Sequence, residues 1–284
     1  MLNRRETKRS EANYYSTGEK RTEAKYNYEI TDFLNKHHRK DRNRMTTIIK
    51  TKKIKIIDTG KHLELSKEAE QKISDHWKEL LEVHPWLFNG HVYSTVKMEN
   101  NDGEVSLECE LSDYANYKCG QVQDLGRYAC KNTYAGGILR SMDGKFFVSL
   151  NGNGSENKGK IQFIGGVIDP DDRNESGELD PIKAAFREFE EEAGSAIRDS
   201  IVSTGDTYLI TDEKKYGVQT VFFSSMSSDE ILDAFEAFKN SSDNTEIARI
   251  ISFGKENIEE LKEYSERHDI GVIDLLTNLI TEEK

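Results

Sequence analysis

The sequence has few of the residues that stiffen or cross-link a chain, with three prolines and three cysteines among 284 residues. Cys109, Cys119 and Cys130 do not make a disulfide framework and lack the close spacing of zinc ligands, so we expect ordinary packing in a reducing cytoplasm. No apolar run approaches the roughly 18 residues of a membrane span. No apolar segment follows Met1 as it would in a secretion signal. These absences predict a cytoplasmic protein that has no membrane partner.

Positive charge is outnumbered, with 40 Lys and Arg residues against 52 Asp and Glu residues. The formal net charge is −12, which disfavours general nucleic-acid binding. The exception is the segment 1–44, which holds 12 Lys and Arg residues against 7 Asp and Glu residues. Its apolar positions show no periodicity before Tyr28, so we expect a flexible basic tail with a short helix near residues 29–38.

One acidic stretch stands out among the features that are present, namely the sequence from Arg187 to Gly194, Arg-Glu-Phe-Glu-Glu-Glu-Ala-Gly. Asp180-Pro181 upstream is typical of a helix N-cap followed by proline in the first turn, and Gly194 is placed to end the helix. The pattern therefore predicts a helix over residues 181–193. At about 100° per residue, three carboxylates share one stripe of this helix: Glu188, Glu191 and Glu192.

Carboxylates packed this closely repel one another unless a cation neutralises them. Oxygen ligands of this kind suit a hard divalent cation such as Mg²⁺ or Mn²⁺. The alternative is a solvated acidic helix face, which is the usual role of Glu-rich helices. The upstream context favours a metal site, because an apolar strand over 161–164 runs into Gly165-Gly166, where a sharp turn exposes carbonyl oxygens.

A Gly-Gly turn, a loop and a helix with Arg-Glu-x-x-Glu-Glu-x-Gly resemble the box of the Nudix hydrolases, G-x5-E-x7-R-E-U-x-E-E-x-G-U, where U is a bulky aliphatic residue. The loop between Gly166 and Arg187 carries seven extra residues, so the isolated glutamate of the pattern is either Glu178 or Glu175. Ser195 stands at the last aliphatic position, where Ile197 could supply the packing. The match runs through Gly166, Arg187, Glu188, Phe189, Glu191, Glu192 and Gly194.

The resemblance implies an α/β fold, a Nudix-type α/β/α sandwich with a mixed sheet. It also implies metal-dependent hydrolysis of a small-molecule partner, a nucleoside diphosphate linked to another group X. Arg187 would orient a neighbouring carboxylate. Glu246, ahead of a late strand, would be a further metal ligand or the general base, with a surface glutamate as the alternative. The residues implied to hold Mg²⁺ or Mn²⁺ are Glu188, Glu191 and Glu192, assisted by a carbonyl near Gly165 or Gly166.

The chain before the box predicts a small α+β module over residues 45–123. Its expected elements are a strand over 46–57, a helix capped by Ser66, and a hairpin of strands 92–98 and 105–111. The pieces 88–93 and 112–114 are similar to the N-terminal part of Nudix enzymes that include UDP-sugar pyrophosphatases, which favours a nucleotide sugar as substrate. The module either packs on the catalytic domain or forms a homodimer.

Residues 124–284 are predicted as the Nudix hydrolase domain, with strands near 134–139, 146–150, 207–210 and 217–224 and helices near 228–239, 256–268 and 271–280. Two other functions stay open on the same fold. One is a non-catalytic nucleotide-binding sensor module, although the complete set of glutamates argues against it. The other is an isomerase of isoprenyl diphosphates, for which no pair of cysteine and glutamate offers support.

Overall fold

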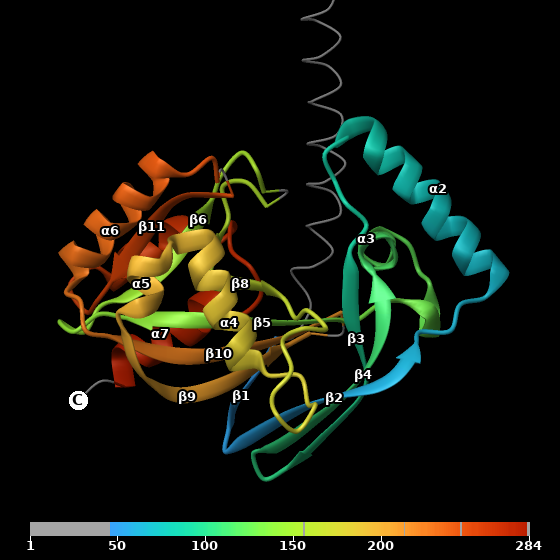
Figure 1. Cartoon of the computed structure of the whole chain (residues 1–284), viewed down its shortest axis with the longest axis horizontal. Helices are drawn as coiled ribbons and strands as arrows, with labels where there is room; N and C mark the ends of the chain where they lie inside the picture. Colours follow the sequence, from blue (N-terminus) through green and yellow to red (C-terminus); the bar gives the residue numbers. More distant parts are fainter. Residues whose placement is uncertain (1–45, 156, 213, 245, 283–284) are drawn as a thin grey trace, which may run out of the picture. The chain divides into compact units, whose positions relative to one another are not determined.

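The computed structural model describes residues 46–155, 157–212, 214–244 and 246–282. The tail predicted over 1–44, including its short helix, lies outside these residues. From Thr46 onward the chain forms one compact unit, whose elements are labelled in Figure 1. None of the helices within the described ranges combines the length and the apolar character needed to cross a bilayer.

Helices and strands alternate along this unit. The helices are α2 (Lys67–Val83), α3 (Tyr114–Val122), η1 (Gly126–Tyr128), α4 (Pro181–Glu188), η2 (Phe189–Ala193), α5 (Ser195–Asp199), α6 (Ser228–Ser241), η3 (Ile258–Tyr264) and α7 (Val272–Glu282). The strands are β1 (Thr47–Thr51), β2 (Lys53–His62), β3 (His91–Asn101), β4 (Glu104–Asp113), β5 (Asn132–Arg140), β6 (Phe146–Asn151), β7 (Ile161–Gln162), β8 (Ile164–Val167), β9 (Ile201–Thr211), β10 (Lys215–Ser224) and β11 (Ile247–Phe253).

The strands join in one mixed sheet in which β5 is central. β10 runs parallel to β5 along one side and antiparallel to β9, which in turn pairs with β1. The other side of β5 is divided among three antiparallel partners: β3 at its start, β8 in its middle and β6 at its end. This division places the short strand β8, with its two glycines, between two diverging parts of the sheet.

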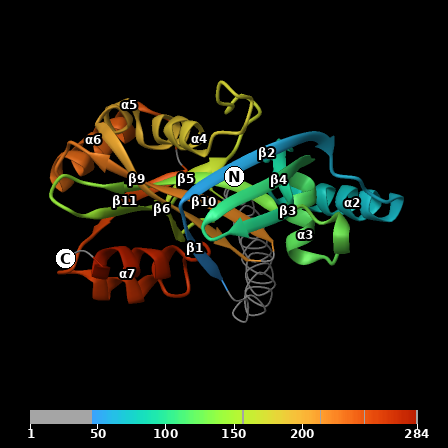
Figure 2. The ribbon, with the colours of Figure 1, turned by 90° about the horizontal axis from the view of Figure 1, so that it is seen from below.

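Helices cover both faces of the sheet, as Figure 2 shows with α4, α5 and α6 on one side and α7 on the other. Phe189, Ile231 and Phe235 pack on one face against Leu139 and Phe222. On the opposite face, a second apolar cluster joins α7 to the sheet through residues that include Ile138, Val221, Leu275, Leu276 and Ile280. The predicted α/β/α sandwich with a mixed sheet is therefore confirmed.

The strands of the segment 45–123 belong to this same sheet. β1 pairs with β9 and β3 pairs with β5, so the predicted boundary near residue 123 falls between α3 and β5 within one compact unit. The helix capped by Ser66 and the hairpin turn near Gly103 are present as predicted. The single strand predicted over 46–57 is wrong, because the chain changes partners at Lys52: β1 lies along β9, whereas β2 runs parallel to β4.

In the second half, one predicted element differs in kind. The segment 256–268 was expected to be an α-helix, but the structure has the 3₁₀-helix η3 there. Asn257 does not cap it with its side chain, because that amide bonds to the Gly254 N–H at 2.8 Å and to the Ser252 carbonyl at 3.0 Å. Within η3 the residues that pack on the core, Ile258, Leu261 and Tyr264, recur every three residues, which suits the three-residue turn of a 3₁₀-helix.

The helix of the acidic stretch begins and ends as its sequence predicts. The Asp180 side chain accepts hydrogen bonds from the backbone N–H groups of Ile182 and Lys183. Gly194 follows the last helical residue with φ +91°, and a Cβ at this glycine would lie 2.8 Å from the Phe238 ring of α6. The chain therefore turns at a point where both backbone conformation and space exclude a side chain.

Gly194→Ala should lower the free energy of unfolding by more than about 2 kcal/mol, because its extended backbone with positive φ costs a residue with a Cβ about 1–3 kcal/mol and overpacking adds to it. Gly177→Ala is the control, since Gly177 also has positive φ (+79°) but nothing lies within 4 Å of an added Cβ. Comparison of the two unfolding free energies by urea denaturation should separate the cost of backbone strain from the cost of crowding against Phe238. Equal losses of stability would show that the contact with Phe238 is unimportant.

Candidate functional site

The two glycines of β8 let a helix approach the sheet closely. Gly165 lies against β5, where an added Cβ would meet the Ala135 carbonyl oxygen at 2.4 Å. At Gly166 an added Cβ would lie 2.6 Å from Oε1 of Glu188. Any side chain at Gly166 would thus displace the first glutamate of the acidic stretch. Gly166 therefore leaves space for the Glu188 carboxylate, and Gly165 leaves space for the backbone of β5.

Arg187 holds the centre of the site together. Its guanidinium donates to the Asp172 carboxylate at 2.9 and 3.3 Å, and to the Val167 carbonyl at 2.9 Å. It also donates to Oε1 of Glu188 at 2.8 Å and to Oε2 of Glu191 at 3.2 Å. Arg187 therefore lies where it can orient carboxylates and tie the loop after β8 to the helix.

Sequence reasoning missed Asp172, the buried partner of Arg187. It lies in an acidic run, and nothing in that run distinguishes it from its neighbours. The two candidates for the isolated glutamate of the Nudix pattern lie elsewhere. Glu178 forms an ion pair with Lys55 of β2 at 2.9 Å, and Glu175 is exposed. Leu179 explains this placement, because its N–H bonds to the Ile56 carbonyl and draws the loop toward β2.

Two glutamates of the predicted stripe are buried. Burial raises the pKa of the Glu188 carboxyl to about 7, a shift that Arg187 opposes and that the charges of Glu191 and Glu246 increase. Burial also raises the pKa of Glu192 well above its usual value, with further contributions from Glu188 and Glu246. The contacts to Oε2 of Glu192 include the Gly165 N–H at 3.3 Å. Arg187 therefore does not offset the cost of ionising both carboxyls, and a further cation would favour their charged forms.

Glu191 points differently from the other two, because the helix changes its hydrogen-bonding pattern after Glu188. Residues Phe189–Ala193 form a π-helical turn, η2. The Glu191 side chain is 57% exposed, whereas Glu188 and Glu192 are 8% and 7% exposed as residues. The simple stripe predicted from α-helical geometry therefore divides into two inward carboxylates and one outward carboxylate that is tied to Arg187.

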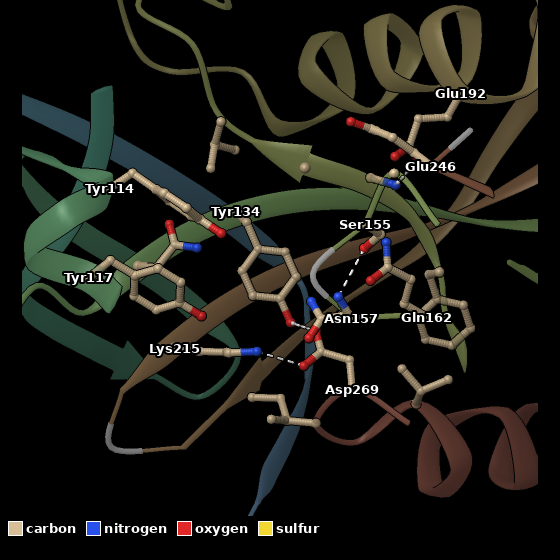
Figure 3. A pocket seen from close by; sticks show the side chains of 18 of the residues that line it. Tyr114, Tyr117, Tyr134, Ser155, Asn157, Gln162, Glu192, Lys215, Glu246 and Asp269 are labelled. Atoms are coloured by element: carbon tan, nitrogen blue, oxygen red, sulfur yellow. Dashed lines mark hydrogen bonds and ion pairs between the residues drawn. The ribbon is translucent and has the colours of Figure 1, made fainter. Parts of the chain in front are cut away.

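Glu246 lies beside Glu192, although 54 positions separate them in the sequence. Figure 3 shows both side chains on one part of the cavity wall. Asn244, which sequence reasoning missed, fixes this approach. Its Nδ2 donates to the Glu191 carbonyl at 2.8 Å, and its Oδ1 accepts from the Glu246 N–H at 2.8 Å. The only available signal was its position two residues before Glu246.

Two adjoining cavities meet at these glutamates. The outer cavity, of about 600 Å³, is lined by all four glutamates, 188, 191, 192 and 246. The inner cavity, of about 410 Å³, shares Glu192 and Glu246 with it and contains Gly165 and Gly166. Trp86 lines both cavities and is 62% exposed, and Phe88 of the inner cavity is 82% exposed. A ligand could therefore extend from an aromatic mouth past the carboxylates.

Away from the glutamates, the inner cavity carries an ion pair that sequence reasoning also missed. Lys215 of β10 lies 2.6 Å from Asp269, whose second carboxylate oxygen accepts from the Tyr134 hydroxyl at 3.2 Å (Figure 3). Burial tends to lower the pKa of Lys215, but the charge of Asp269 outweighs it and holds that pKa well above its usual value. The pair is therefore charged and mutually compensated.

The acidic residues suit a hard cation in chemistry, but they are not arranged around a common point. Within the described ranges, no group of three or more His, Cys, Asp or Glu side chains is arranged so that it could hold a metal ion. The reason lies in their present partners, since Arg187 binds both Glu188 and Glu191. The excess of buried carboxylates nevertheless fits a divalent cation, which would relieve their repulsion.

Comparison with known proteins adds little at the level of sequence, since no family model and no curated protein matches the chain. Among solved structures, a MutT protein from Methanosarcina mazei Go1 matches with 18% identity and a TM-score of 0.25, over 39% of this chain and 95% of that one. The Bacillus subtilis pyrophosphohydrolase BsRppH, in a mutant form, matches with 12% identity and a TM-score of 0.30, over 69% and 97%. At values this low, function has to be inferred from the side chains of the site.

The raised pKa of Glu188 predicts a loss of stability with rising pH. Below about pH 4.5 the carboxyl is protonated in both the folded and the unfolded state, whereas ionisation in the folded state is delayed to about pH 7. Between these values the folded state loses up to about 3 kcal/mol, at about 1.4 kcal/mol per pKa unit. In EDTA, Glu188→Gln should therefore gain unfolding free energy relative to the wild type as pH rises from about 5 to about 7.5.

Glu191→Gln provides the matched control, because that carboxylate lies in the same stretch but faces solvent. Because the Glu191 charge is only one contribution to the raised pKa of Glu188, Glu191→Gln should gain less unfolding free energy than Glu188→Gln over the same rise in pH. A parallel pH dependence of Glu188→Gln and wild type would show that Glu188 ionises as an ordinary surface carboxyl.

Proposed function

We propose that this protein is a metal-dependent diphosphatase of the Nudix type, which cleaves a nucleoside diphosphate linked to a group X into a nucleoside monophosphate and phosphorylated X. One observation carries the proposal. Buried Glu188 and Glu192 lie with Glu246 near Gly165-Gly166, where two cavities adjoin: Glu192 and Glu246 line both cavities and Glu188 lines the outer one. Glutamates with a purely structural role would not need to be buried together in this way, because burying each carboxylate costs hydration free energy.

Glu188, Glu191 and Glu192, with a backbone carbonyl near Gly165 or Gly166, would hold Mg²⁺ or Mn²⁺. When bound, the cation would neutralise the charge of the non-bridging phosphate oxygens and lower the pKa of water. Arg187 also binds Asp172 and the Val167 carbonyl, and these bonds would fix the helix against β8 while Glu188 and Glu191 serve as ligands.

Glu246 is the residue that we propose to take the proton from the attacking water. Its side chain lines both cavities, so it reaches the space in which a diphosphate would lie. Its backbone is held on two sides, because its N–H bonds to Asn244 and its carbonyl accepts from the Gly152 N–H at 2.6 Å. A positioned carboxylate of this kind can act as a general base.

A nucleotide sugar is the favoured substrate. The two pieces of sequence that resemble UDP-sugar pyrophosphatases each contribute to the inner cavity, the first through Phe88 and the second through Tyr114. The cavity combines aromatic rings with amide, hydroxyl and charged groups, as recognition of a base and a sugar requires. The carboxylates at its wall would then lie next to the diphosphate that joins them.

Glu192→Gln should lower kcat at saturating Mg²⁺ by at least about 100-fold, because it removes one charge from the proposed metal ligands. The fold should persist, since a neutral side chain relieves the repulsion with Glu188 and Glu246. Glu190→Gln is the control: it lies in the same turn but pairs with Arg198 and lines neither cavity. A kcat within about tenfold of wild type in Glu192→Gln would exclude the metal assignment.

The products should be two phosphorylated fragments, because water is the nucleophile and attacks one phosphorus of the diphosphate bridge. For a UDP-sugar these are UMP and a sugar 1-phosphate. In ¹⁸O-water, mass spectrometry should find one heavy oxygen on the phosphate of one fragment, and EDTA should abolish the reaction. Label on the sugar carbon, or orthophosphate as the primary product, would contradict attack at the bridge.

A further inference from the structure

The floor of the inner cavity is built from three neighbouring strands in fixed register. Gly165, Gly136 and Gln219 are paired across β8, β5 and β10. Four residues further along the strands, Asn132 of β5 is paired with Lys215 of β10. Four residues of strand span about 13 Å. The first row of paired residues, Gly165, Gly136 and Gln219, lies at the glutamate end of the cavity, because the Gly165 N–H donates to Glu192. The second row, Asn132 and Lys215, lies at the far end.

Two amide oxygens in this floor have no partner. Asn132 is 7% exposed and Gln219 is 3% exposed, and both line the cavity. Among the described residues, Oδ1 of Asn132 and Oε1 of Gln219 are buried and accept no hydrogen bond. The Gln219 amide lies across Gly136, where an added Cβ would be 2.6 Å from that oxygen. Unmet buried acceptors are costly, and a ligand that carries hydrogen-bond donors would satisfy them.

At the far end of the inner cavity lies the ion pair of Lys215 and Asp269, whose charges neutralise each other. Lys215 and Asp269 are each about one-fifth exposed, to the cavity that they line, and Tyr134 donates its hydroxyl to Asp269. The Tyr134 ring lies over Gly217, where an added Cβ would be 2.5 Å away. This arrangement leaves N–H donors of the ammonium and lone pairs of the carboxylate for a ligand that offers both kinds of partner.

The balance of charge determines which part of a substrate fits there. Lys215 is the only Lys or Arg among the described residues that line the inner cavity, and Asp269 already neutralises it. A phosphate at this end would find no uncompensated positive charge. A nucleobase, which binds best by stacking, has the exposed rings of Trp86 and Phe88 at the mouth.

We infer that the inner cavity floor is a subsite for an uncharged ring with several hydroxyl groups, the sugar X of the substrate, and that Gln219, Asn132 and the Lys215–Asp269 pair select it. This assignment rests on the proposed function, in which the diphosphate lies at Glu192. The hydroxyl nearest the phosphate donates to Gln219. The distal hydroxyls reach Asn132, Lys215 and Asp269.

The test compares ligands with and without the sugar. Dissociation constants of UDP-glucose, ADP-glucose, UDP and ADP are measured by calorimetry in EDTA with the full chain, and hydrolysis of the two sugar nucleotides is measured with Mg²⁺. The wild type should bind at least one sugar nucleotide about tenfold more tightly than the matching diphosphate. Gln219→Met, which keeps side-chain length, should reduce that preference about tenfold, as expected for lost hydrogen bonds.

Gln162→Met is the matched control, because Gln162 lines the same cavity but its Oε1 already accepts from Asn151 at 3.0 Å. It should leave the preference unchanged. Tyr134→Phe retains the ring over Gly217 and should weaken the preference severalfold through Asp269, so the assignment remains testable if Gln219→Met does not fold. UMP and glucose 1-phosphate separate the two halves of the substrate. A loss confined to UMP would assign the floor to the nucleoside and overturn the proposal.

The two proposals fail in different ways. Absence of hydrolysis of any diphosphate by the wild type with Mg²⁺ would overturn the proposed function, whatever the binding data show. Hydrolysis combined with an unchanged sugar preference in Gln219→Met and Tyr134→Phe would overturn the sugar subsite alone. A wild type that binds diphosphates as tightly as their sugar derivatives would also overturn it.

Discussion

The site depends on the guanidinium of Arg187, because that one group binds polar atoms of three pieces of chain that meet around the carboxylates. It binds the loop through Asp172, the end of β8 through the Val167 carbonyl, and its own helix through Glu188 and Glu191. Loss of this cation would leave the 2%-exposed Asp172 without a cationic partner, and breaking a buried ion pair typically costs about 3–5 kcal/mol. The carboxylates can be held near the sheet only while this positive charge remains.

Arg187 does not contact every carboxylate of the site. Arg187 contacts Glu188 and Glu191, whereas the described contacts of Glu192 are to the Gly165 N–H and to Glu246. Protein stability alone would favour an apolar side chain at Glu192, so the fold tolerates a local conflict at the point where the two cavities meet. Local conflicts of this kind are typical of sites that bind a ligand of opposite charge.

Local signals predicted the frame of this site, and tertiary contacts determined its details. The helix start follows from Asp180-Pro181 and its end from Gly194, because caps depend only on nearby atoms. The orientation of Glu191 could not be predicted, since the π-helical turn forms where Phe189 packs into the space over Gly137. Asp172 was hidden in an acidic run, and the partners Lys215 and Asp269 lie 54 residues apart. No local pattern links residues that lie so far apart in the sequence. The change of strand partner at Lys52 could not be predicted either, because the β propensity of the sequence is continuous across that residue.

The π-helical turn also makes the acidic stretch sensitive to its length. Such a turn holds one residue more than an α-helical turn between bonded groups, so its five residues, Phe189–Ala193, set which glutamates face inward. A substitution at an outward-facing position does not change which glutamates face inward. The loss of one residue would return the segment to α-helical winding and rotate Glu192 relative to Glu188. In this stretch, spacing carries information that composition does not, and a homologue with one residue fewer would have to use a different glutamate for the same position in space.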